Sequence, residues 1–192
     1  MLYKFLSGLA KGVTHCIFRV KVVGKENVPK DGGMILAVNH KSNWDPIFAG
    51  AYCPRPLRFM AKADLFKNKL FGGLIKKLGA FPIQRGRGDI GAIKGAFSIL
   101  KNNDAMLIFP EGHRIKNGKR VKAKLGVSMI AVYAKVPVIP LCISGEYKPF
   151  HKVTVTFGKP ITFEEYYGKK PDNETLQTLA DEVMQTIYSF DN

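Results

Sequence analysis

The residues best suited to chemistry lie in one short segment, Asn39–Pro46. It contains His40 and, five positions later, Asp45. The apolar run 34–38 precedes it and predicts a buried strand that delivers His40 to a loop at the strand end. Open α/β sheets place their chemistry at such strand ends. If Asp45 binds one ring nitrogen of His40, the other nitrogen is free to act as a general base.

The same segment has a purely structural interpretation. Asp45 followed by Pro46 is a common helix start, with Asp45 as the N-cap and Pro46 in the first turn. His40 would then be an ordinary turn residue. A His-x4-Asp spacing is short and frequent, so the spacing alone does not decide between the two interpretations.

A second candidate site follows another apolar run, 105–109, which leads into the segment Pro110–Arg114. This segment contains Glu111 and Arg114, although a plain turn with solvated charges would have the same composition. Alternating patterns predict strands at 19–23 and 153–157. Apolar stretches predict strands at 57–61 and 136–141, and the prolines of 136–141 favour an edge strand. These strands alternate with helical patterns, which predicts an α/β sandwich.

Size and charge narrow the function classes. The chain has 192 residues, which is typical of one domain, and its 30 Lys and Arg against 15 Asp and Glu give a net charge of +15. Such an excess favours a polyanionic partner: nucleic acid, an anionic lipid surface or an acidic protein. The three cysteines are scattered, which indicates reduced thiols in a cytosolic compartment. No stretch free of Lys, Arg, Asp and Glu exceeds ten residues, far fewer than the ~20 that cross a bilayer.

Residues 1–18 form a segment of their own. Apolar residues recur there at steps of three and four, which predicts an amphipathic helix that packs on the domain or lies in a membrane interface. Residues 19–192 form the remaining domain. Within it, 65–78 mixes apolar residues with lysines, as in a surface helix or helical hairpin near an anionic interface, or in a solvated basic face.

Four segments, taken in order, resemble the glycerolipid acyltransferases of the 1-acyl-sn-glycerol-3-phosphate acyltransferase type. Asn39–Asp45 matches the NHxSxxD block of that family, and 109–114 resembles its FPEGTR block. Residues 79–85 resemble the second block, which ends in arginine, and 136–141 the fourth, which contains proline. One departure is His113, where the family usually has Thr or Ser, and this leaves the details of acceptor recognition open. The resemblance implies a single-domain αβ sandwich with a mixed sheet, plus the N-terminal amphipathic helix.

The resemblance also implies residue roles. His40 would take the proton of the acceptor hydroxyl, oriented by Asp45. The substrate-binding set is implied to be Arg85, Glu111, Gly112, Arg114 and, more weakly, Lys62. Arginines suit a phosphate monoester, and the resemblance assigns the glycerol part to Glu111. We expect no metal and no cofactor, because the thioester donor is already activated.

The implied reaction moves a fatty acyl group from acyl-CoA or acyl carrier protein to the sn-2 hydroxyl of 1-acyl-glycerol-3-phosphate (lysophosphatidic acid), giving phosphatidic acid. We expect a peripheral, monotopic enzyme on the cytoplasmic face of the cell membrane, bound to anionic lipid through its basic surface. The alternatives are an acyltransferase for glycerol-3-phosphate or another lysophospholipid, a lipid-binding relative without catalytic activity, and a basic nucleic-acid-binding domain. Nucleic acid is not expected, since it leaves His40 and Asp45 unexplained.

Overall fold

The computed structural model describes residues 2–83, 90–115 and 119–191. The helices within these ranges are α1 (Leu2–Ile17), α2 (Asp45–Tyr52), α3 (Lys69–Lys77), α4 (Ile90–Lys101), α5 (Gly126–Ala134) and α6 (Asn173–Ser189). The strands are β1 (Arg19–Val23), β2 (Met34–Val38), β3 (Leu57–Lys62), β4 (Ala80–Ile83), β5 (Ala105–Ile108), β6 (Val138–Gly145) and β7 (Lys152–Phe157). Short 3-10 turns lie at Lys25–Asn27 (η1), Ala63–Phe66 (η2) and Glu164–Tyr166 (η3).

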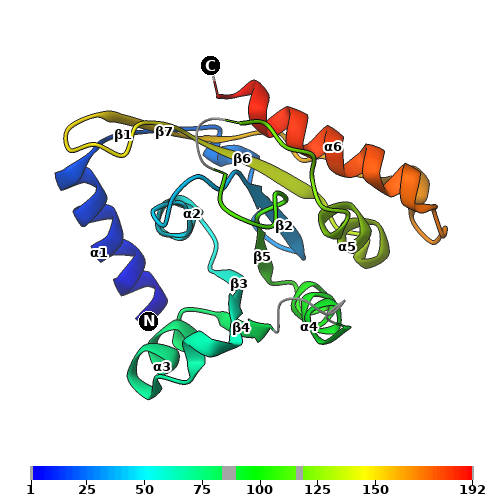
Figure 1. The fold of residues 1–192 in the computed structure, drawn as a ribbon, viewed down its shortest axis with the longest axis horizontal. Helices are drawn as coiled ribbons and strands as arrows, with labels where there is room; N and C mark the ends of the chain where they lie inside the picture. Colours follow the sequence, from blue (N-terminus) through cyan, green and yellow to red (C-terminus); the bar gives the residue numbers. More distant parts are fainter. Residues whose placement is uncertain (1, 84–89, 116–118, 192) are drawn as a thin grey trace.

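The described strands form one mixed sheet in the order β1-β7-β6-β2-β5-β3-β4 (Figure 1). Among these described strands, only β6 and β7 pair in antiparallel fashion, and the other neighbours are parallel. The strands β2, β3, β4 and β5 therefore end at the same edge of the sheet. His40 follows β2 and Glu111 follows β5, its direct neighbour, so the topology brings the two candidate blocks together.

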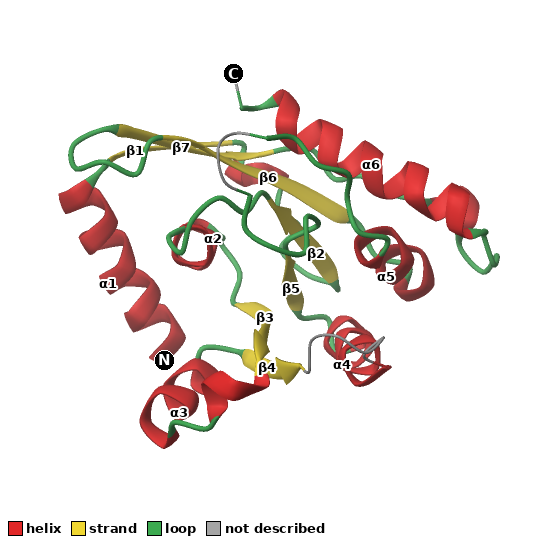
Figure 2. Ribbon diagram, in the orientation of Figure 1, coloured by secondary structure: helices red, strands yellow, loops and turns green. Residues whose placement is uncertain are grey.

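Both faces of the sheet are covered, which confirms the expected αβ sandwich with a mixed sheet (Figure 2). All five residues of β2 are fully buried, and they alternate between two apolar layers. Ile35 and Ala37 pack with α4, α5 and α6, while Met34, Leu36 and Val38 pack with α2. The rigid, doubly covered strand gives His40 a fixed starting point.

The expectation of an edge strand at 136–141 was wrong. The segment enters β6, which lies inside the sheet between β7 and β2. Pro140 is tolerated because its carbonyl accepts a hydrogen bond from the Gly158 N–H at 2.8 Å, so its backbone polar groups point toward the end of the β7 ladder. The missing N–H therefore removes no hydrogen bond to β2.

Helix α1 packs on α2 through polar groups rather than through its apolar stripe. The Tyr3 hydroxyl donates to the Gly50 carbonyl at 3.3 Å, and Thr14 Oγ1 lies 2.7 Å from the Tyr52 hydroxyl. The apolar residues expected on one face are divided, since Leu6 and Ile17 are half-buried while the others face outward. The exposed members are Leu2, Phe5, Leu9, Val13 and Cys16.

Candidate active site

Asn39 fastens the loop that carries His40 to the sheet. Its side-chain amide donates to the Ile143 carbonyl at 3.1 Å and accepts from the Ile143 N–H at 2.8 Å. This pair of bonds continues the β2–β6 ladder beyond Val38, the last residue of β2. Asn39 is nearly buried, and the chain turns away from the sheet directly after it. The position of His40 is thereby tied to a central strand.

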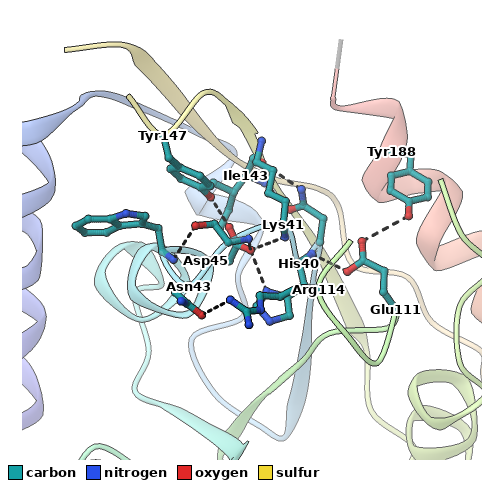
Figure 3. A network of polar contacts seen from close by, with 12 residues as sticks. His40, Lys41, Asn43, Asp45, Glu111, Arg114, Ile143, Tyr147 and Tyr188 are labelled. Carbon is teal, nitrogen blue, oxygen red and sulfur yellow. Dashed lines mark hydrogen bonds and ion pairs between the residues drawn. The ribbon is translucent and has the colours of Figure 1, made fainter. Parts of the chain in front are cut away.

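His40 and Asp45 meet side chain to side chain (Figure 3). The Nδ1 atom of His40 lies 2.9 Å from Oδ2 of Asp45, and the Asp45 side chain is fully buried. The same oxygen accepts from the backbone N–H groups of Lys41 at 2.6 Å and Ser42 at 2.7 Å. An ionised carboxylate only accepts hydrogen bonds, so Nδ1 of His40 carries the ring proton and Nε2 is left with a lone pair.

Asp45 is also the first residue of α2, and Pro46 occupies the first turn. The structural interpretation of these residues is therefore correct about where the helix starts. Its assignment of Asp45 as the N-cap is wrong, because Trp44 is the N-cap and gives no side-chain cap. The carboxylate instead accepts from the loop that precedes the helix and from His40. Asp45 thus both begins α2 and contacts His40.

Two further aromatic residues hold this pair, and the sequence analysis assigned neither of them a role. The Tyr147 hydroxyl donates to Oδ1 of Asp45. Burial and the Asp45 charge raise the pKa of Tyr147, so it remains a phenol that can donate. The Phe109 ring stacks on the His40 imidazole with centroids 4.0 Å apart and planes 21° apart. These contacts fix both the acid and the plane of the imidazole.

Glu111 lies behind His40 rather than out in solvent, with only 2% of its surface exposed. Its Oε2 accepts from the His40 N–H at 2.6 Å, and the Tyr188 hydroxyl on α6 donates to Oε1 at 3.5 Å. Burial raises the pKa of Glu111 to about 7, an effect that the Asp45 charge reinforces. Glu111 therefore supports the backbone of the histidine, whereas its expected contact with glycerol stays a prediction.

Arg114 lies over the loop of the first block. Its Nη1 donates to Oδ1 of Asn43 at 2.8 Å, and the next residue, Ile115, donates its N–H to the His40 carbonyl at 2.7 Å. The side chain is exposed, so most of its donors face solvent. Gly112 has φ of 75° and closes the turn between Glu111 and Arg114, a conformation that favours glycine. The structure thus joins the first and third blocks.

The other two expected phosphate ligands stand apart from this group. Lys62 ends β3 at the same edge of the sheet, where its Nζ pairs with Asp64 at 2.5 Å. Like Arg114, it does not line the hollow beside His40 that the described residues form. Arg85 lies outside the described residues. Their roles as substrate ligands stay predictions.

The site opens into a hollow of about 430 Å³ above the strand ends. His40, Lys41 and Glu111 line it from the two blocks. Tyr147, which follows β6, and Tyr188 on α6 close it from the other side. In the part of the chain that the structure describes, no three His, Cys, Asp or Glu side chains are grouped as metal ligands would be. The group is a buried acid, an oriented imidazole and an exposed guanidinium, which suits proton transfer beside an anion.

A family model described as "Acyltransferase" matches residues 19–144, about two thirds of the chain. The match includes both the first and the third block. The chain belongs to the acyltransferase family.

Two relatives of this acyltransferase share the same enzyme name. A Bacillus subtilis (strain 168) protein named 1-acyl-sn-glycerol-3-phosphate acyltransferase is 31% identical over 100% of this chain and 98% of its own length. A Streptococcus pneumoniae protein of the same name is 33% identical over 100% of this chain and 74% of its own length. These full-length similarities confirm the resemblance seen in the four blocks.

A solved structure agrees with the fold of this acyltransferase. The crystal structure of the 1-acyl-sn-glycerophosphate (LPA) acyltransferase PlsC from Thermotoga maritima superposes with a TM-score of 0.78 and 28% identity. The superposition covers 98% of this chain and 79% of the other. The fold of the acyltransferase, α1 included, is therefore that of a PlsC-like enzyme.

Proposed function

We propose that this enzyme transfers a fatty acyl group from a thioester, acyl-CoA or acyl carrier protein, to the sn-2 hydroxyl of 1-acyl-glycerol-3-phosphate. The product is phosphatidic acid. The observation that carries the proposal is the 2.9 Å contact between His40 Nδ1 and a fully buried Asp45. It provides a general base inside a chain whose full-length relatives carry this activity in their names.

In the proposed mechanism, Nε2 of His40 accepts the proton of the acceptor hydroxyl as its oxygen attacks the thioester carbonyl. Asp45 stabilises the imidazolium that forms. Collapse of the tetrahedral intermediate breaks the C–S bond, and the imidazolium returns the proton to the departing thiolate. General base catalysis of this kind contributes ~10²- to 10⁴-fold. No acyl-enzyme is required, since Cys53 and Cys142 are buried and Cys16 lies on α1.

The acceptor phosphate is assigned to Arg114, whose guanidinium is exposed above the His40 loop. Arginine binds phosphate oxygens through paired, charge-assisted hydrogen bonds. Arg85 and Lys62 remain the further candidates for this phosphate. Neither metal nor cofactor is part of the proposal, because the thioester carbonyl is already reactive toward an activated alcohol.

We also propose that the enzyme is peripheral on the cytoplasmic face of the membrane, bound through α1. Within residues 2–83, 90–115 and 119–191, no helix is both long and apolar enough to cross a bilayer. The support for surface binding is the outward apolar stripe of α1, in which Phe5 is 68% exposed. The net charge of +15 would attract the protein to anionic lipid, and equally an acidic acyl carrier protein to the enzyme.

The test is transfer of labelled acyl groups from acyl-CoA and from acyl carrier protein to a panel of acceptors. We expect the highest kcat/KM with lysophosphatidic acid and a loss of ~10²-fold or more in kcat for His40→Ala. His151→Ala is the matched control, because its imidazole is exposed and pairs with Glu146 at 3.5 Å, so the rate should be unchanged.

The same panel separates the parts of the proposal. Arg114→Ala should raise KM for the phosphorylated acceptor more than it lowers kcat. Full activity of His40→Ala would remove the proposed base. A preference for glycerol-3-phosphate or for a lysophospholipid with another headgroup would keep the chemistry and replace the acceptor.

A further inference from the structure

Helix α3 and the preceding η2 turn present apolar side chains to the outside of the molecule. Leu70 is 89% exposed, and Leu65, Phe71 and Leu74 are also exposed. Leu70 and Leu74 are one turn apart with Phe71 beside them, so they form one patch on the helix. Of the α3 residues only Gly72 and Ile75 are buried, where Ile75 packs with Ala61 and Ala80. A surface helix normally turns its larger apolar residues inward, and α3 does the opposite.

The charged residues of α3 are all positive. Lys69, Lys76 and Lys77 are exposed on α3, and the helix contains no acidic residue. The nearest acid in sequence, Asp64, is already paired with Lys62 at 2.5 Å and with Lys67 at 2.7 Å. An apolar patch bordered by lysines is complementary to a bilayer that contains anionic lipids, where apolar groups enter and cations meet phosphates.

The patch lies beside the outward stripe of α1. Tyr3, in the first turn of α1, accepts through its hydroxyl from the Leu57 N–H at 3.1 Å. The chain leaving α3 passes the same point, since a Cβ on Gly79 would lie 2.6 Å from the Leu57 carbonyl oxygen. Figure 1 shows the N-terminal end of α1 next to α3, with α5 and α6 at the other end of the molecule. The two exposed apolar helix surfaces are therefore neighbours.

We propose that α3 is a second membrane-insertion element, which enters the same anionic bilayer as α1. The inference rests on the peripheral binding proposed above and adds a second point of attachment. A single interfacial helix leaves the domain free to roll about the helix axis. Insertion of α3 fixes that rotation, so the strand-end edge with His40 is held in one orientation relative to the lipid headgroups.

Fluorescent labelling can locate both helices on the membrane. Cys16 is exposed on α1, whereas burial raises the pKa of Cys53 to about 11 and that of Cys142 to about 12, so a maleimide dye reacts selectively with Cys16. The α3 probe is Leu70→Cys in a Cys16→Ser background, and Gln185→Cys on α6 is the matched exposed control. With vesicles containing phosphatidylglycerol, we expect a blue shift for the dye at positions 16 and 70 and none at 185.

Cosedimentation with vesicles measures how much each side chain adds to membrane binding. Leu70→Ser with Phe71→Ser should lower partitioning into phosphatidylglycerol vesicles at least tenfold. Lys76→Gln and Lys77→Gln should each lower it about fivefold, and only when the vesicles are anionic. Phe5→Ser with Leu9→Ser gives the matched measurement for α1. All variants should retain native turnover of a water-dispersed, short-chain acceptor, which separates membrane attachment from the proposed chemistry.

Two results would overturn the proposal. A dye at position 70 that stays in water while the dye at 16 inserts would leave α3 as a solvated basic helix. A Leu70→Ser, Phe71→Ser variant that partitions normally but sediments as a smaller species in the ultracentrifuge would show that a second copy of the chain covers the patch. Circular dichroism melts of each variant verify that the fold is intact.

Discussion

At the residue scale, Asp45 holds the site together because its two oxygens serve different partners. Oδ2 accepts from His40 and from two backbone N–H groups of the loop, while Oδ1 accepts from Tyr147. The sequence allowed the first contact, because His40 and Asp45 are five positions apart, and the resemblance in four blocks favoured it over the purely structural interpretation. It did not predict the second, since Tyr147 is 102 residues away and reaches Asp45 only through the pairing of β2 with β6.

Tyr147→Phe tests that second contact. The change removes one of the hydrogen bonds that hold the Asp45 carboxylate in position against His40. We expect kcat to fall roughly tenfold, the usual order for a hydrogen bond to a charged group, with little change in acceptor KM. Tyr133→Phe, on the exposed side of α5, is the control and should leave kcat unchanged.

Glu111→Gln tests the buried carboxyl behind His40. The pKa of Glu111 is about 7 in the fold against an ordinary 4.5, so between these values the folded state holds a proton that the unfolded chain has released. The contribution of Glu111 to the free energy of unfolding is fully present below about pH 4.5. It falls by up to ~3 kcal/mol as the pH rises to about 7. The neutral glutamine side chain should abolish this slope in urea unfolding measured at several pH values.

Glu174→Gln is the control for that experiment, because Glu174 is exposed in the first turn of α6. It should retain the decline in stability between about pH 4.5 and 7 that Glu111 causes. An unchanged slope in Glu111→Gln would show that another group releases the proton. The sequence alone could not identify this behaviour, because the burial of Glu111 depends on Tyr188 and the packing of α6.

At the scale of elements, α1 shows that a correctly predicted helix leaves open which of its sides packs on the domain. Its period of three to four predicted a helix, and α1 spans Leu2–Ile17. The apolar stripe did not indicate which face packs on the domain, since Tyr3, Ser7 and Thr14 make the contacts with α2 and β3. By contrast, the apolar face of α6 is fully packed as expected, with Leu179 and Val183 in the core.

Thr14→Val tests the polar seam between α1 and α2, which Tyr3, Ser7 and Thr14 form from the α1 side. Thr14 is fully buried, and its hydroxyl lies 2.7 Å from that of Tyr52. Valine keeps the shape but loses this bond, which should cost ~1 kcal/mol and lower Tm by ~2–4 °C in a domain of this size. Thr178→Val on α6 is the control, since its exposed hydroxyl donates to the Glu174 carbonyl of its own helix. Equal Tm values for the two variants would mean that the seam adds no stability.

At the scale of the whole molecule, the order of elements was predictable and their neighbours were not. Local patterns placed β2, β5 and β7 nearly at their observed bounds, because β2 and β5 are apolar runs and β7 alternates apolar with polar residues. Strand order depends on pairings between distant segments, such as β1 with β7 and β6 between β7 and β2. The prediction that the Pro140 segment is an edge strand was wrong for this reason. Proline lacks an N–H donor, but this does not keep it out of an inner strand of the sheet.

The contact between Tyr188 and Glu111 has a consequence for biosynthesis. A nascent polypeptide emerges from the ribosome with its N-terminal residues first, so the histidine loop is translated long before α6 exists. Glu111, which supports this loop, therefore gains its contact with Tyr188 only after a further 77 residues have been translated. Products released by premature termination before α6 would carry both His40 and Asp45 and still lack this contact with Glu111.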